Sequence, residues 1–109
     1  MRTKTSDIFD WDEANIAHIA KHGVLADEAE EVVSNNPLDI GKQTREGEER
    51  LMQIGATLSG RVLVVITTLR GLKTRVVTAY PATPAYRAFY SVHKGSTHHG
   101  KENPSQLQE

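Results

Sequence analysis

The feature that most constrains the fold is a series of four strand-like segments between residues 38 and 80. Two short breaks that contain glycine, Ser59-Gly60 and Arg70-Gly71, separate the last three segments. Breaks this short join neighbouring strands as hairpins, so we predict an antiparallel sheet. The apolar run at residues 62–66 predicts that the third strand is the most buried. The four segments are LDIGKQ (38–43), RLMQIGAT (50–57), RVLVVITTL (61–69) and KTRVVTAY (73–80).

Two helices are predicted ahead of this sheet. The first covers residues 13–22, with Asp12 in the N-cap position and Gly23 as the stop. The second covers residues 25–36 and ends before Pro37. The residues predicted to face inward are Ile16, Ile19, Ala20, Ala29, Val32 and Val33.

One short strand and one further helix complete the expected order of elements. DIFDW (7–11) alternates as a strand does, and Thr83-Pro84 is a typical helix start. The last helix places Tyr86, Phe89, Tyr90 and His93 on one stripe, which we expect to pack on the sheet. The prediction is an α+β domain with the order β-α-α-β-β-β-β-α. It has a mainly antiparallel sheet of four to five strands, with its helices on one face.

The length of 109 residues suits a single domain, which we place at residues 1–93, followed by a disordered tail at 94–109 without periodicity. No apolar run approaches the ~20 residues of a membrane span, and the N-terminus does not resemble a signal peptide. Cysteine is absent, which fits a reducing cytoplasm. These features predict a cytoplasmic protein with no contact to membranes.

Charge is divided unevenly along the chain. Residues 1–38 hold three basic and eight acidic side chains, whereas residues 39–90 hold eight basic and four acidic ones. We therefore expect residues 39–90 to form the surface that faces a polyanion. The alternative is that these charges are scattered and serve only solubility. The acidic helix at 25–36 faces either a basic partner or solvent.

Four local motifs, in order, resemble the BrnT-type toxins. FDWDEANIAHIAKHGV (9–24) is similar to the family's F-x-W-D…K-H-G-V opening, and GEERLMQIG (47–55) to its E-E-R-hydrophobic-x-x-I-G strand. GRVLVVI (60–66) and RVVTAY (75–80) are similar to its third and fourth strands. The resemblance covers residues 9 to about 90 and implies a RelE-like ribonuclease fold.

The resemblance also implies a function. The protein would be the toxin of a type II toxin–antitoxin pair, an endoribonuclease that cleaves mRNA, either free or on the ribosome. It would use no metal or cofactor. A cognate antitoxin, expected to carry a ribbon-helix-helix domain, would neutralise it and supply any contact with DNA. The alternative is a catalytically weak or inactive binding module on the same fold, which acts through its antitoxin-like partner.

Cleavage of this kind needs proton transfer at the ribose 2′-hydroxyl and at the leaving 5′-oxygen, and fixed donors for the phosphate. We assign phosphate binding to Arg50 and Arg75, because guanidinium matches phosphate oxygens and stays charged. The alternative is that each arginine pairs only with a nearby glutamate, for which the candidates are Glu46, Glu48 and Glu49.

Three further residues are candidates for the catalytic step. Glu49 is a possible general base, or else a salt-bridge partner that orients Arg50. His22 suits proton transfer near neutral pH, or else caps the end of its helix. Tyr80 stands where the family often has arginine, so it can donate a hydrogen bond but carries no positive charge. Alternation places Arg75 and Tyr80 on opposite faces unless the strand ends or a bulge intervenes.

Four residues are candidates for contact with RNA outside the catalytic step. Arg45 lies in a loop, and Arg61 follows a glycine turn, where a purely structural role is the alternative. Arg87 lies off the aromatic stripe of the last helix, and Tyr90 lies nearest its end. His18 and His22 have a spacing that can bind zinc, but no third ligand accompanies them, so we predict no metal site.

Overall fold

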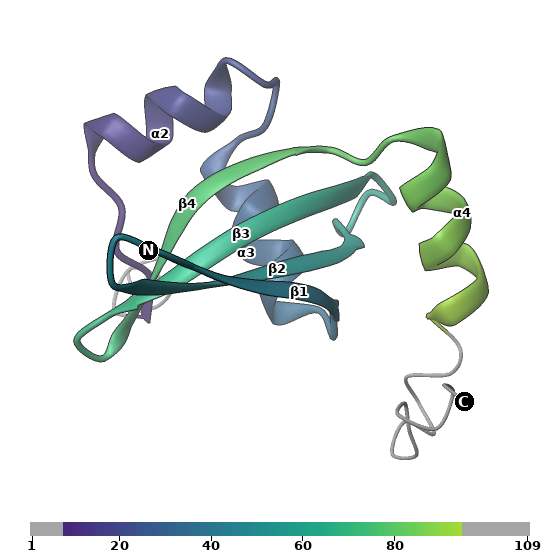
Figure 1. Cartoon of the computed structure of the whole chain (residues 1–109). Coiled ribbons are helices and arrows are strands. Elements are labelled where there is room, and N and C mark those ends of the chain that lie inside the picture. The colour runs from purple at the N-terminus through teal and green to yellow at the C-terminus, as the bar shows by residue number, and fades with distance from the viewer. Residues whose placement is uncertain (1–7, 95–109) are drawn as a thin grey trace.

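The computed structural model describes residues 8–94 and contains one four-stranded antiparallel sheet (Figure 1). The spatial order follows the chain order, as the glycine breaks predicted. Side chains at 63, 64 and 65 have no exposed surface, so the third strand is indeed a buried one. The strands are β1 (Leu38–Arg45), β2 (Glu48–Ala56), β3 (Val62–Arg70) and β4 (Lys73–Pro81).

The β1–β2 hairpin closes on the two residues Glu46 and Gly47. Both have positive φ, 53° and 79°, as a two-residue turn of the mirror-image type requires. This turn brings Arg45 opposite Glu48 and Gln43 opposite Arg50. The charged segment that precedes the second strand is thereby paired across the sheet.

Two helices, α2 (Glu13–Ala20) and α3 (Ala26–Ser34), cover one face of the sheet. Their buried side chains form a core with two alternate residues of β3 and with two residues of β4 that point to the same face. Asp12 caps α2 as predicted, accepting a hydrogen bond from the Asn15 amide. The residues of this core are Phe9, Ile19, Val24, Ala29, Val32, Leu63, Val65, Val76 and Ala79, with Trp11 and Val33 packed against it.

The carboxylates of α3 are largely used within the fold. Glu30 accepts a hydrogen bond from the Trp11 indole at 2.7 Å, and Glu31 accepts one from the Leu58 amide at 3.0 Å. Glu28 forms an ion pair with Arg61 at 2.8 Å. The acidic side chains of α3 therefore bind groups of their own domain in addition to contacting solvent.

The last helix, α4 (Pro84–His93), packs on the opposite face of the sheet. Thr83 caps it as predicted, accepting from the Tyr86 amide. Tyr86 and Tyr90 pack against a second core around Ile54 and Val64, which alternate with the residues of the first core. The expectation that all helices share one face was wrong, because both faces of the sheet carry apolar side chains that need cover.

Two details of the N-terminal part also differ from expectation. The predicted strand at 7–11 is reduced, in the described residues, to one bridge between Phe9 and Thr74, which is parallel. In α2, Ile16 and Ala20 are exposed and Asn15 is buried instead. The Asn15 side chain binds the backbone at three points: it donates to the carbonyls of Asp10 and Val76, and it accepts from the Asp12 amide.

Some expectations fall outside this description. Almost all of the tail predicted at 94–109, including His98 and His99, lies outside the described residues, and the division at residue 93 stays a prediction. None of the helices between residues 8 and 94 is long and apolar enough to cross a membrane.

We predict that Asn15→Ala lowers the free energy of unfolding by about 2–3 kcal/mol, because it leaves a buried backbone group of Val76 and part-buried ones of Asp10 and Asp12 without their partner. The measurement is denaturant unfolding. Asn35→Ala is the matched control, because the side chain of exposed Asn35 makes a single hydrogen bond, to the Ala56 carbonyl at 3.3 Å. It should cost less than about 1 kcal/mol. Equal losses for the two variants would contradict the role given to Asn15.

Candidate functional site

An extra residue in β4 decides which side chains share a face of the sheet. Val77 has no partner opposite it in β3, so the pairing shifts there. Without this bulge, Arg75 and Tyr80 would point to opposite faces, because side chains alternate along a strand. With it, Arg75 lies opposite Thr68 and Tyr80 lies opposite Val64, which point to the same face of β3. The bulge thus brings Arg75 and Tyr80 onto one face.

Arg50 lies on this face as well. Met52, two residues further along β2, pairs with Ile66, which shares the face of Thr68. Arg45 joins Arg50, because Arg45 pairs with the residue two positions before Arg50. We call this side of the sheet the arginine face. Its members Arg45, Arg50, Arg75 and Tyr80 were all candidates from the sequence.

Arg75 is held by two carboxylates that precede α2. Its guanidinium nitrogens lie 3.1 and 3.3 Å from the two oxygens of Asp12, and 3.5 Å from Asp10 Oδ2. The side chain of Arg75 is 16% exposed, whereas that of Asp12 is 53% exposed. The hydrogen bond from Arg75, followed by that from the Asn15 amide, lowers the pKa of Asp12 below its ordinary value. Arg75 is therefore oriented by a bidentate ion pair with Asp12, and solvent reaches this pair from the side of the carboxylate.

Arg50 shares the carboxylate of Glu48 with a third arginine. Arg50 Nη2 lies 3.2 Å from Glu48 Oε1, and Arg70 Nη2 lies 3.0 Å from Glu48 Oε2. The hydrogen bond from Arg70, aided by the one from Arg50, lowers the pKa of Glu48. The Nε of Arg50 is buried and has no hydrogen-bond partner among the described residues. Two guanidinium groups thus converge on one carboxylate, and one of them keeps an unused donor.

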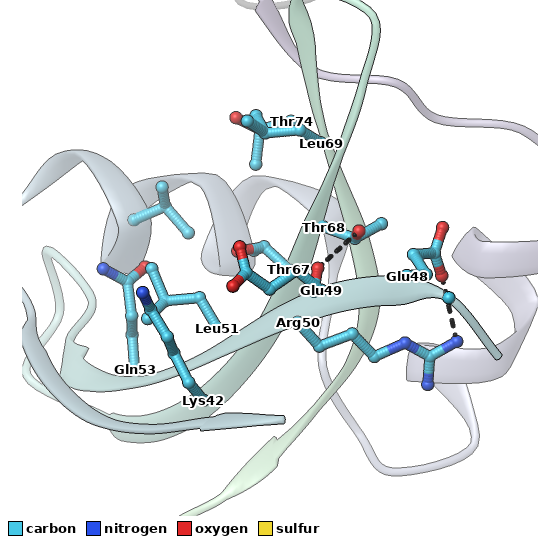
Figure 2. A pocket seen from close by; sticks show the side chains of 12 residues that line it. Lys42, Glu48, Glu49, Arg50, Leu51, Gln53, Thr67, Thr68, Leu69 and Thr74 are labelled. Atoms are coloured by element: carbon cyan, nitrogen blue, oxygen red, sulfur yellow. Dashed lines mark hydrogen bonds and ion pairs between the residues drawn. The ribbon is translucent and has the colours of Figure 1, made fainter. Parts of the chain in front are cut away.

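Glu49 is placed away from these arginines. It lines a hollow of about 560 Å³ together with Lys42, Leu51 and Gln53 (Figure 2). Glu48 and Arg50 also line this hollow, but along β2 the Glu49 side chain points to the face opposite to theirs. In this view the Arg50 side chain extends away from Glu49 and toward Glu48 (Figure 2). Because neighbours along a strand alternate, the sheet separates Glu49 from the arginine face. Of the three glutamates considered as partners for Arg50, the structure selects Glu48.

His22 and Tyr80 come together at the edge of the arginine face. Their ring centroids lie 6.3 Å apart with the rings edge to face, and His22 is exposed. His18 lies beside them, with its ring centroid 5.3 Å from that of His22 and its Nε2 3.1 Å from Thr78 Oγ1. Burial, followed by the nearby Tyr86 hydroxyl, raises the pKa of Tyr80. The Tyr80 hydroxyl is thus a donor at neutral pH and a poor base.

The remaining candidates are spread over the molecule. Arg45 does not lie in a loop as expected but is the last residue of β1, because it pairs with Glu48 across the hairpin. It is exposed and makes no ion pair within residues 8–94. Arg61 lies at the β2–β3 turn, where its Nη1 donates to the Glu28 carboxylate and the Gly23 carbonyl. Arg87 donates to the Ala82 carbonyl, and Tyr90 packs against the second core. Arg61 is therefore remote from Arg50 and Arg75, as expected of a residue at a hairpin end.

Sequence reasoning missed the carboxylates of Asp10 and Asp12 and the pair of His18 with Thr78. Asp12 was identified only as a helix cap, and its second partner, Arg75, lies 63 residues away in the chain. His18 was considered only for its spacing to His22. Between residues 8 and 94, no three side chains of the His, Cys, Asp and Glu types gather as a metal site would require.

These features define an α+β domain with four antiparallel strands. One face of its sheet carries arginines and a tyrosine, and two histidines of α2 lie at the edge of that face. The chain matches the family described as the ribonuclease toxin BrnT of type II toxin–antitoxin systems, over residues 11–85. It belongs to that family, which confirms the resemblance seen in its motifs. No curated protein matches the chain.

We predict that Arg75→Gln raises the pKa of Asp12 toward its ordinary value of 3.8, because the largest cause of its lowering is removed. Because the pKa of Asp12 is lowered in the folded protein, the stability that Asp12 contributes is complete above its ordinary, unfolded-state pKa. This stability is lost as the pH falls through the lowered pKa of the folded state. Carboxyl NMR titration of Asp12 measures the shift. Arg61→Gln, which removes an arginine on the other side of the molecule, should leave the Asp12 titration unchanged. An Asp12 titration that is identical in the wild type and Arg75→Gln would contradict the assigned cause.

Proposed function

We propose that this protein is a toxin that cleaves mRNA without a metal ion, by attack of a ribose 2′-hydroxyl on the adjacent phosphate. Membership of the BrnT family supports ribonuclease activity at the level of the family. In our proposal the toxin acts in the cytoplasm, where it cleaves mRNA either free or on the ribosome. A cognate antitoxin with a ribbon-helix-helix domain neutralises it and makes any contact with DNA.

The observation that carries this proposal is the placement of Arg50 and Arg75 on one face together with Tyr80. Two guanidinium groups on a common surface can share the charge of a phosphate that gains negative charge in the transition state. Of their present partners, Asp12 is 53% exposed and Glu48 is 25% exposed. Pairs open to solvent contribute only ~0–1 kcal/mol, so a phosphate can compete most readily with Asp12.

Two other residues support the proton transfers. Tyr80 keeps its proton at neutral pH, so its hydroxyl can donate to a phosphate oxygen or to the leaving 5′-oxygen. His22 lies next to Tyr80 and is exposed to solvent. Glu49 is a less suitable base in this arrangement, because it lies across the sheet from Arg50.

A second candidate function is a binding module without useful catalysis. The observation that favours it is the same set of carboxylates, since Asp10, Asp12 and Glu48 already satisfy Arg75 and Arg50 in part. Tyr80 in place of the family's frequent arginine removes one fixed positive charge. In this reading the chain binds its antitoxin-like partner, and RNA is not cut.

We predict that the purified chain cleaves single-stranded RNA in EDTA and that Arg50→Ala and Arg75→Ala each lower kcat/KM by about 10²–10³-fold. The reason is the loss of one fixed donor to the phosphate. Arg61→Ala is the matched control, because it removes an ion-paired arginine of the other face. Its cleavage rate should stay within about twofold of the wild type.

Thermal unfolding of each variant shows whether the fold is kept. No cleavage by the wild type, with growth unaffected when the chain is produced alone, would favour the binding module. Cleavage that survives both arginine substitutions would remove Arg50 and Arg75 from the mechanism.

A separate prediction concerns the hydroxyl of Tyr80. Tyr80→Phe keeps the ring that packs on the second core and removes the donor, so kcat should fall about tenfold or more with little change in thermal stability. Tyr86→Phe, on the neighbouring helix in the same core, is the control and should leave kcat unchanged. Equal rates for the wild type and Tyr80→Phe would show that the ring matters only for packing.

A further inference from the structure

The seam between α2 and β4 holds a row of polar contacts that lead onto the arginine face. The segment from Asp10 to the end of α2 runs alongside β4 in the same direction (Figure 1). The first contact is the ion pair of Asp12 with Arg75, and the second joins His18 Nε2 to Thr78 Oγ1 at 3.1 Å. The third is the edge-to-face approach of His22 to Tyr80.

Thr78 ties the middle of this row to the proposed site. It pairs with Ile66, so its side chain points to the same face as Arg75 and Tyr80 and lies between them on β4. His18, bound to the Thr78 hydroxyl, is therefore positioned beside the arginine face although it belongs to a helix that packs on the other one. Its ring is exposed, so a ligand can reach it.

The proposed reaction needs a proton acceptor near neutral pH on this side of the sheet. Asp12 and Glu48 are occupied by arginines, and both have a lowered pKa, which makes them weak bases. Tyr80 holds its proton. The ring of a neutral histidine carries one nitrogen that can accept a proton, and His18 and His22 supply such rings here.

We propose that His18 is the general base of the cleavage and that Thr78 is the residue that positions it. This inference rests on the proposed ribonuclease function and names a residue that the family motifs do not single out. His18 is favoured over His22 because a direct hydrogen bond fixes its ring to the strand that carries Arg75. When Nε2–H donates to Thr78 Oγ1, Nδ1 keeps its lone pair and accepts the proton.

The step balances without a further reactant. The 2′-hydroxyl gives its proton to His18 Nδ1 while its oxygen forms a bond to phosphorus. The bond from phosphorus to the 5′-oxygen breaks, and that oxygen takes a proton from solvent or from the Tyr80 hydroxyl, which then regains one from solvent. The products are a 2′,3′-cyclic phosphate and a free 5′-hydroxyl, with His18 protonated until solvent removes the proton.

Charged and titratable groups surround His18 from two elements. On α2 they are His22, one turn further on, and Asp12 at the helix start, and on β4 they are Arg75 and Tyr80 on either side of Thr78. A pH dependence measured for cleavage therefore has to be assigned by substitution. His22 is the neighbour that most needs to be separated from His18.

The test compares His18→Gln with His22→Gln in the full chain, across pH 5 to 9, with a single-stranded RNA in EDTA. The wild type should lose activity as the pH falls, because a general base must be unprotonated. His18→Gln should lower kcat/KM by about 10²–10⁴-fold and abolish this acid limb. His22→Gln should keep the limb.

Two variants of Thr78 test the positioning role. Thr78→Val removes the hydroxyl at similar shape, and it should lower kcat and change the acid limb while KM for RNA stays within about twofold. Thr78→Ser restores the hydroxyl and should restore both. A purely structural Thr78 would instead change thermal stability without moving the pH profile.

The outcomes separate this inference from the proposed function. If the wild type cleaves and His18→Gln cleaves with the same rate and acid limb, the inference is wrong and the ribonuclease stands. A limb that disappears in His22→Gln alone would give the role to His22 and overturn the assignment to His18. A wild type that does not cleave RNA would overturn both.

Discussion

The candidate site depends on the single unpaired residue Val77 in β4. A regular strand would direct Arg75 and Tyr80 to opposite faces, and the core and the arginine face would exchange side chains beyond that point. With the bulge, Val76 and Ala79 both reach the core under α2 and α3, while Arg75 and Tyr80 both reach the other face. One residue thus satisfies the packing of the core and the grouping of the polar side chains together. Bulges are common near functional sites for this reason, because they redirect a side chain without ending the strand.

A second constraint is the cover of the β4 edge. An edge strand leaves backbone groups without partners, and here the Asp10 amide and the Asn15 side chain bind the carbonyls of Thr74 and Val76. Because Asn15 also binds the backbone of Asp10 and Asp12, it sets the rotation of α2 about its axis. That rotation turns Ile16 outward and brings His18 to Thr78. The hydrogen bonds of Asn15 therefore both cover the edge of β4 and set how α2 contacts that strand.

Local signals in the sequence predicted most of the fold. Gly60 and Gly71 mark the last two hairpins, and Asp12 and Thr83 mark two helix starts, whereas the turn at Glu46 and Gly47 was not predicted. A bulge was considered beside an early strand end but the choice was left open, because RVVTAY contains neither glycine nor an interruption of its apolar pattern to signal one. The face chosen by α4 depends on which side of the sheet α2 and α3 leave uncovered, and no local pattern encodes that. For the site, the residue types were found, but the partners of Arg75 lie more than 60 residues away, and only the folded chain brings them together.

The carboxylates on the arginine face bear on how an RNA would bind there. Asp12 stands at the N-terminus of α2, where the helix dipole and the guanidinium of Arg75 both favour negative charge. A phosphate that binds Arg75 enters the same field and competes with a carboxylate that is attached to the protein. The affinity is then the difference between two ion pairs rather than the full strength of one. Under the proposed function, the arginines are held in place before RNA arrives, and weak binding to unrelated polyanions follows from the same competition. Under the proposed function, this reconciles a domain of nearly neutral charge with a site proposed to stabilise a phosphate in its transition state.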